Sequence, residues 1–166
     1  MTGIFPQPLV DRAEEALETC RGLGLMLVVA ESCTGGMVAA CLTSIAGASA
    51  VVERGFVTYT NRSKQDMLGV PPHLFTSVGA VSEEVARAMA EGALDRSAAH
   101  VSVSVTGIAG PGGATPGKPV GLVHLASARK GRATLHERHV FSGDRDAVRR
   151  QATEAALRLL LRQIGD

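Results

Sequence analysis

The chain has 166 residues, enough to bury one full hydrophobic core, and its composition marks no second domain, so we expect one domain over residues 1–166. Its 17 basic and 16 acidic side chains give a formal net charge of +1, with no Trp, one Tyr and four Phe. Nucleic-acid binding depends on basic surfaces and aromatic stacking, so this composition argues against a nucleic-acid partner. The oligomeric state stays open, a homo-oligomer included.

Cysteine and histidine usage argues against a metal site. Cys20, Cys33 and Cys41 are odd in number and lack C-x-x-C spacing, which fits neither a disulfide framework nor a structural zinc site. The five histidines include no i, i+4 pair.

No segment has the roughly 18 apolar residues of a membrane span, and the first residues lack a signal-peptide layout. We therefore expect a cytoplasmic protein without a membrane partner.

Hydrophobic periodicity predicts helices that alternate with strands. Apolar residues at helical spacing from Leu9 to Cys20 predict a first helix, which Gly22 and Gly24 end. The other expected elements are strands at residues 25–30, 51–60, 101–105, 120–128 and 134–141, helices at 37–44, 82–95 and 146–164, and loops or short turns at 68–80. The strand at 51–60 passes into a polar segment at 61–64, which puts Lys64 just beyond a strand end.

This order of elements predicts an α/β protein, a three-layer α/β/α sandwich with a mixed, mostly parallel sheet of about five strands. Ligands of such sheets bind near strand ends that lead into loops. If the first three strands are parallel, their exits lie along one edge of the sheet. The exits that hold the plausible chemistry are residues 31–36, 59–64, 106–113 and 142–145.

The sequence Glu-Ser-Cys-Thr-Gly-Gly at residues 31–36 lies where a strand passes into a helix. Free backbone N–H groups at a helix start can hold a phosphate or the oxyanion of an acyl-transfer intermediate, and a serine there is a candidate nucleophile. The simpler interpretation is that Ser32 and Thr34 cap the helix, while Gly35 and Gly36 close the turn. Local sequence leaves both interpretations open.

A second motif concerns the glycine-rich loop that begins at residue 107. Residues 112–118 fit G-x-x-x-x-G-K, which is typical of the phosphate loop of nucleotide hydrolases. Pro119, however, occupies the position whose hydroxyl would bind Mg²⁺, and residues 120–128 are expected to form a strand where the motif requires a helix. We therefore do not expect a nucleotide hydrolase of that class.

Five runs of sequence carry a family resemblance over nearly the whole chain. They are Ala-Glu-Ser-Cys-Thr-Gly-Gly (30–36), Glu-Arg-Gly-Phe-Val-Thr-Tyr (53–59), Gly-Ala-Val-Ser (79–82), Thr-Gly-Ile-Ala-Gly-Pro (106–111) and Phe-Ser-Gly-Asp-Arg (141–145). In these runs the chain resembles the C-terminal domain family of the competence/damage-inducible protein CinA. The resemblance implies a three-layer α/β/α fold and the free-standing form of a nicotinamide-nucleotide amidase. Such an enzyme hydrolyses nicotinamide mononucleotide to nicotinate mononucleotide and ammonia in pyridine-nucleotide salvage.

The resemblance implies a nucleophile at Ser32 and a base at Lys64, with Tyr59 beside them. A lysine can take the proton of a serine hydroxyl only when burial or neighbouring charge lowers its pKa towards neutrality. Cys33 is intrinsically the better nucleophile, but adjacent side chains in a turn point in different directions, and a small cysteine is often buried. We therefore prefer Ser32, and the reaction needs no metal or organic cofactor.

Substrate contacts are expected at the strand exits. The residues concerned are Glu31, Thr34, Gly35, Gly36, Thr106, Gly107, Gly110 and Arg145. Backbone N–H groups at residues 34–36 would stabilise the oxyanion, and Glu31 would either orient Lys64 or Ser32 or only complete the turn. Arg145 would bind the 5′-phosphate of the substrate, because its fork of donors matches phosphate oxygens. The alternative for Arg145 is an exposed ion pair with Asp144 or Asp146.

A non-catalytic nucleotide-binding module is the alternative to the amidase. In that hypothesis the same serine, glycine and arginine groups hold a phosphate without chemistry. The family name itself reflects a link to competence and damage responses, not a reaction. Release of ammonia from nicotinamide mononucleotide would separate the two hypotheses.

Overall fold

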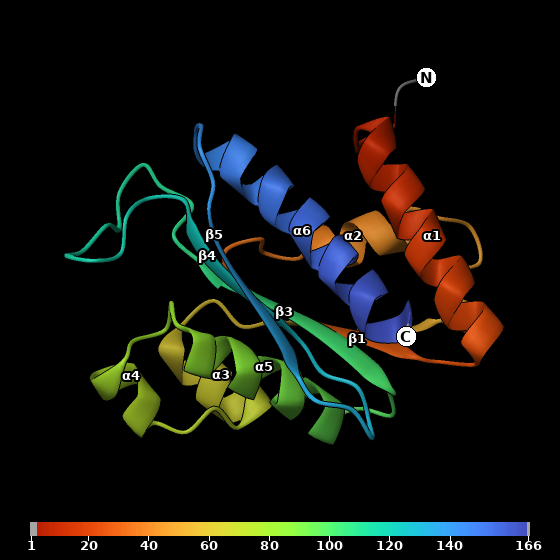
Figure 1. The fold of residues 1–166 in the computed structure, drawn as a ribbon, viewed down its shortest axis with the longest axis horizontal. Helices are drawn as coiled ribbons and strands as arrows, with labels where there is room; N and C mark the ends of the chain where they lie inside the picture. The colour runs from red at the N-terminus through yellow and green to blue at the C-terminus, as the bar shows by residue number, and fades with distance from the viewer. Residues whose placement is uncertain (1–2, 166) are drawn as a thin grey trace.

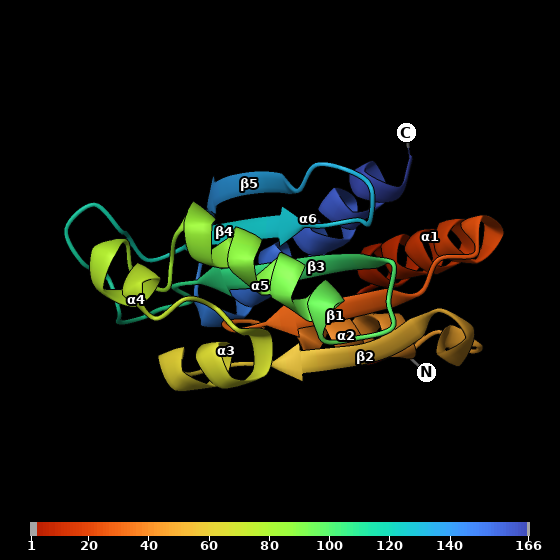
Figure 2. The same cartoon turned by 90° about the horizontal axis from the view of Figure 1, so that it is seen from below.

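The computed structural model describes residues 3–165, which form a five-stranded sheet between two layers of helices (Figure 1). The strands are β1 (Leu27–Glu31), β2 (Val52–Val57), β3 (Val101–Gly107), β4 (Leu122–Ser127) and β5 (Leu135–Val140). Their order in the sheet is β2-β1-β3-β4-β5, with β2 and β5 at the two edges (Figure 2). The predicted three-layer α/β/α sandwich with a mixed sheet is confirmed.

Strand direction brings the expected exits together. β1 pairs in parallel with both β2 and β3, β4 is antiparallel to β3, and β5 is antiparallel to β4. β5 therefore runs in the same direction as the first three strands. As a result, the chain segments that follow β1, β2, β3 and β5 all leave the sheet on the same side, the edge formed by the carboxyl ends of these four strands.

Three helices cover each face of the sheet. On one face lie α1 (Gln7–Leu23), α2 (Met37–Thr43) and α6 (Arg145–Gly165), and on the other lie α3 (Asn61–Leu68), α4 (His73–Ser77) and α5 (Glu83–Asp95) (Figures 1 and 2). A short 3₁₀ turn, η1 (Ala48–Ala50), precedes β2. No helix within residues 3–165 combines the length and the apolar character needed to cross a bilayer.

The interior strand β1, between β2 and β3, is buried over all five residues, as expected for a strand covered on both faces. Its side chains alternate between the faces. Leu27 and Val29 belong to the hydrophobic core under α1 and α6, whereas Val28 and Ala30 belong to the core under α5. The site residues that follow this strand therefore start from a strand that is packed on both faces.

The main difference from the sequence prediction is helix α3. The expected strand at 51–60 is shorter, because β2 ends at Val57, and the polar segment after it is helical. Thr60 and Ser63 form a capping box: the Ser63 N–H donates to Thr60 Oγ1 at 3.0 Å, and the Thr60 N–H donates to Ser63 Oγ at 3.1 Å. Lys64 and Leu68, four residues apart, face inward. A lysine at a core-facing position concealed the helical pattern.

Residues 68–80 also contain α4, a helix of only five residues, where loops or short turns were expected. The prediction about the G-x-x-x-x-G-K segment agrees with the structure, because Lys118 is followed by β4 and not by a helix. The Lys118 amine donates a hydrogen bond to the Val78 carbonyl. This lysine therefore ties the glycine-rich loop to the segment that precedes α5.

Candidate active site

Ser32 and Lys64 meet at the sheet edge defined by the strand exits. Ser32 follows β1, and its N–H donates to the Val105 carbonyl of β3 at 3.0 Å. Lys64 lies in the first half of α3, and its amine donates to Ser32 Oγ at 2.9 Å. A second hydrogen bond joins the amine to the Thr58 carbonyl at 2.7 Å. The structure thus joins two residues that lie 32 positions apart in the sequence.

Lys64 is in an unusual environment for a lysine, because only 1% of its surface is exposed. Burial disfavours the charged ammonium and lowers the pKa of Lys64 from its ordinary value of 10.5 to about 8. Near neutral pH a useful fraction of the side chain is therefore a neutral amine. Such an amine at 2.9 Å from Ser32 Oγ can accept the hydroxyl proton.

The Glu31 carboxylate binds groups of the turn and of α2, and within residues 3–165 it makes no hydrogen bond to the side chains of Ser32 or Lys64. One carboxylate oxygen accepts hydrogen bonds from Thr34 Oγ1 at 2.6 Å and the Val38 N–H at 2.9 Å, and the other accepts from the Ala39 N–H at 3.0 Å. Of the two roles considered for Glu31, the structure gives it the one that completes the turn. A buried carboxylate at a helix start is stabilised by the free N–H groups and the helix dipole.

The simpler interpretation of Ser32 and Thr34, that they cap α2, is wrong. The N-cap is Gly36, no N-cap side chain bonds the helix, and the Thr34 hydroxyl donates to Glu31 instead. Gly35 and Gly36 do close the turn, with φ angles of 59° and 103° that favour glycine. Ser32 is consequently left with Lys64 as its side-chain partner.

Cys33 belongs to the hydrophobic core under α1 and α6. It is 6% exposed, and burial raises the pKa of its thiol to about 11, so the reactive thiolate is scarce at neutral pH. No hydrogen bond joins its sulfur to Lys64 among residues 3–165. The geometry therefore favours Ser32 over its neighbour as the nucleophile.

Arg145 connects two of the strand exits. One guanidinium nitrogen donates to the Gly110 carbonyl and the other to the Tyr59 hydroxyl, both at 2.8 Å. Arg145 therefore bonds across the site instead of pairing with Asp144 or Asp146. Tyr59 is 56% exposed, and its hydroxyl lies in this bridge; within the described part of the chain it makes no hydrogen bond to Ser32 or Lys64.

The residues expected to contact substrate at the third strand exit, Thr106, Gly107 and Gly110, also make close contacts within the protein. The Thr106 hydroxyl is buried and donates to the Ala80 carbonyl at 2.9 Å. A Cβ atom at Gly107 would lie 2.7 Å from Val123 Cγ2, and one at Gly110 would lie 2.6 Å from Val120 Cγ1. Both glycines therefore let the loop pack closely on neighbouring residues, whether or not a ligand is bound.

Arg149 is a site residue that the sequence analysis missed. From α6 its Nε donates to the Cys33 carbonyl at 3.1 Å, and its Nη2 donates to the Thr34 carbonyl at 3.0 Å. The available signal was its spacing from Arg145: residues four apart on a helix share a face, so both arginines point towards the same edge.

The structure offers no candidate metal site within residues 3–165, because no group of three ligating side chains lies together there.

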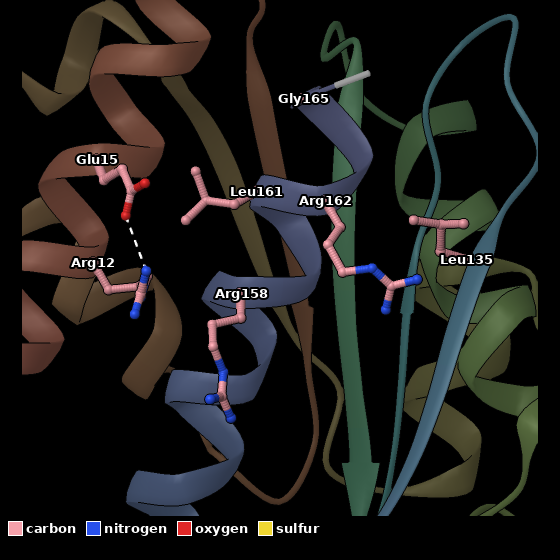
Figure 3. Close-up of a pocket in the computed structure, with 7 residues that line it drawn as sticks. All are labelled: Arg12, Glu15, Leu135, Arg158, Leu161, Arg162 and Gly165. Atoms are coloured by element: carbon pink, nitrogen blue, oxygen red, sulfur yellow. Dashed lines mark hydrogen bonds and ion pairs between the residues drawn. The ribbon is translucent and has the colours of Figure 1, made fainter.

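The hollow drawn in Figure 3 is separate from this site. It has a volume of about 520 Å³ and is lined by Arg12, Glu15, Leu135, Arg158, Leu161, Arg162 and Gly165. Its α6 residues come from the end of that helix opposite Arg145, and a helix of this length spans roughly 30 Å. None of the expected site residues lines it, so this hollow does not enter the catalytic argument.

Solved structures and family models identify the fold. The crystal structure of competence/damage inducible protein CihA from Agrobacterium tumefaciens superposes with a TM-score of 0.96 at 47% identity, covering 99% of this chain and 100% of that one. A CinA superfamily protein from Escherichia coli gives a TM-score of 0.90 at 33% identity, covering 98% and 94%. The model of the CinA C-terminal domain matches residues 10–164. The chain belongs to the CinA C-terminal domain family, as its sequence motifs predicted.

Relatives in this family differ in length. The chain is 48% identical over 155 residues to the protein named nicotinamide-nucleotide amidohydrolase PncC of Escherichia coli, covering 93% of this chain and 94% of PncC. It is 53% identical over 137 residues to a CinA-like protein of Akkermansia muciniphila, covering 82% of this chain but 33% of that protein. The chain thus spans about a third of the length of the CinA-like relatives it matches.

The buried hydroxyl of Thr58 leads to a prediction about stability. Its Oγ1 has no hydrogen-bond partner among residues 3–165, and an unsatisfied buried hydroxyl costs about 1–3 kcal/mol. Thr58→Val keeps the shape of the side chain and removes the orphan atom. We expect it to raise the free energy of unfolding by about 1 kcal/mol in urea denaturation.

Thr106→Val is the matched control, because it deletes a buried hydroxyl that donates to the Ala80 carbonyl. It is expected to lower the free energy of unfolding by about 1 kcal/mol or more. Equal losses in the two variants would show that the Thr58 hydroxyl is satisfied in solution.

Proposed function

We propose that this chain is a nicotinamide-nucleotide amidohydrolase, which converts nicotinamide mononucleotide to nicotinate mononucleotide and ammonia in pyridine-nucleotide salvage. The observation that carries the proposal is the buried Lys64 amine at 2.9 Å from the Ser32 hydroxyl. A relative that matches nearly the whole chain, PncC of Escherichia coli, supports it through its name.

The proposed reaction begins with proton transfer. The neutral amine of Lys64 takes the proton of Ser32, and the Ser32 oxygen attacks the carboxamide carbon of the substrate. The tetrahedral intermediate collapses as the lysine ammonium returns a proton to the amide nitrogen, so ammonia leaves and an ester to Ser32 remains. Lys64 then activates a water that hydrolyses this ester. Neither a metal nor an organic cofactor enters these steps.

The oxyanion would be stabilised by the turn after Ser32. The Gly35 N–H is already used, since it donates to the Ser32 carbonyl at 2.9 Å. The N–H groups of Thr34 and Gly36 have no acceptor within the described residues. Thr34 is fully buried and Gly36 is partly exposed, so the Gly36 N–H is the donor that a ligand can reach. Preorganised N–H donors of this kind are worth about 10²–10³-fold in rate each.

The 5′-phosphate of the substrate is assigned to Arg145. A guanidinium has five N–H donors, so the two hydrogen bonds to Tyr59 and Gly110 leave others for a phosphate. Arg145 is exposed at the sheet edge that also holds Ser32. We propose that Tyr59 takes part through this arginine, at the mouth of the site.

The test of the proposed function is ammonia release from nicotinamide mononucleotide by the purified protein. Ser32→Ala is expected to abolish release and to leave the fold intact, because the side chain is small and its loss leaves no large cavity. Cys33→Ala is expected to stay active. The opposite result for the two variants would assign the nucleophile to Cys33. Binding of the nucleotide without any release would favour the non-catalytic module.

The proposed base predicts a pH dependence. Protonated Lys64 cannot accept the serine proton, so kcat/KM should rise with pH and level off above the pKa of about 8. Lys64→Ala is expected to lower kcat by about 10³-fold or more. A flat profile between about pH 6 and pH 9 would count against a lysine base.

The proposed phosphate contact is tested with two substrates. Arg145→Ala should raise KM for nicotinamide mononucleotide by about tenfold or more, because a charge-assisted bidentate contact is lost. Turnover of nicotinamide riboside, which has no phosphate, should change little. An equal loss on both compounds would mean that Arg145 supports the fold or the chemistry and that the phosphate is held elsewhere.

A further inference from the structure

Arg149 has no role in the mechanism described above, yet its charge is directed at the turn that carries Ser32. The side chain is partly buried and makes no salt bridge within residues 3–165. Its two hydrogen bonds go to consecutive backbone carbonyls, those of Cys33 and Thr34, at 3.1 and 3.0 Å. Both hydrogen bonds of this partly buried arginine therefore go to the loop that follows the proposed nucleophile, and the purpose of these two contacts has to be explained.

The geometry of the peptide bond explains how Arg149 can orient this turn. In a trans peptide the C=O and N–H bonds point in opposite directions. Arg149 holds the Cys33 carbonyl towards α6, and it holds the Thr34 carbonyl together with the Met37 N–H, which donates to the same oxygen at 3.1 Å. The N–H groups of Thr34 and Gly35 therefore point away from α6. The Gly35 N–H then donates to the Ser32 carbonyl, and the Thr34 N–H is left without an acceptor among the described residues.

The turn is held from two sides by opposite charges. Glu31 binds the Thr34 hydroxyl and two N–H groups of α2, while Arg149 binds the two carbonyls. The flat guanidinium presents Nε and Nη2 as parallel donors, which match two neighbouring carbonyls in a way that the single point charge of a lysine cannot. A cation on these oxygens also polarises the two peptides and makes their N–H groups stronger donors.

We propose that Arg149 is a positioning residue for the oxyanion hole: it fixes the two peptides after Cys33, and with them the turn from which the partly exposed Gly36 N–H is presented to the substrate oxyanion. It acts through the backbone and does not touch the substrate. This inference rests on the proposed amidase function. It differs from the role assigned to Arg145, which lies one helical turn earlier and would bind the phosphate directly.

The variants that test it are Arg149→Met, which removes the donors and keeps the length, Arg149→Lys, and Arg149→Ala, which leaves space for added guanidinium ion. Arg150→Met is the matched control, because Arg150 is the next residue of α6 and its side chain is exposed. Ammonia release from nicotinamide mononucleotide gives kcat and KM, and thermal unfolding reports the fold.

We expect Arg149→Met to lower kcat by about 10²-fold, in the range of a lost oxyanion donor, with KM within about threefold of wild type. The pH at which the rate levels off should not move, since Lys64 is unaffected. Arg149→Lys should lie between wild type and Arg149→Met, and Arg150→Met should match wild type. Added guanidinium ion should restore part of the activity of Arg149→Ala, because it can donate to the same two carbonyls from the space that the side chain leaves.

Three results would overturn the inference. They are an unchanged kcat in Arg149→Met, a rise in KM without loss of kcat, and a loss that neither the lysine variant nor added guanidinium relieves in folded protein. If Arg149→Met does not fold, the lysine variant and the guanidinium experiment decide. Wild-type protein that releases no ammonia would instead overturn the proposed function, so the two failures are distinguishable.

Discussion

The hydrogen bond between the Lys64 amine and the Ser32 hydroxyl is the interaction on which the rest of the site depends. It requires a lysine in the protein interior, which is costly unless the amine is bonded and can lose its proton. Two elements of the fold, β1 and α3, place the two partners of this hydrogen bond in the interior. β1 is fully buried and holds Ser32 at its end, and α3 packs Lys64 against it from the next strand exit. The lowered pKa follows from the same burial that holds the two side chains together.

Around this pair, the charged side chains of Glu31 and Arg149 bind backbone groups, and within residues 3–165 they form no salt bridge with each other. Glu31 binds N–H groups at the start of α2, and Arg149 binds carbonyls of the preceding turn. Each charge is therefore paired with peptide dipoles of the opposite sense, which lowers the cost of placing it near the interior. Within residues 3–165 no carboxylate forms a salt bridge with Lys64; such a negative charge would raise the pKa of Lys64 and keep it protonated.

Sequence reasoning predicted the layers, the five strands and the edge where the exits meet, because alternating and helical periodicities follow directly from burial. It failed at α3, where the inward position is a lysine and no hydrophobic pattern exists to detect. The resemblance to the family singled out Ser32 and Lys64, and the position of Arg145 after the last strand singled out that arginine. No motif could reveal that Arg149 bonds the Cys33 and Thr34 carbonyls, because that contact depends on where α6 is packed and not on local sequence.

The second hydrogen bond of Lys64, to the Thr58 carbonyl at 2.7 Å, has a consequence for the durability of the proposed catalyst. A neutral amine beside a serine ester is itself a nucleophile, and attack on the ester would form a stable amide that ends turnover. The Thr58 carbonyl restrains the amine, and its own position is fixed because the Thr58 N–H donates to the Glu31 carbonyl of β1 at 2.8 Å. In the proposed mechanism, protection against self-acylation would come from main-chain atoms, which no side-chain substitution can delete.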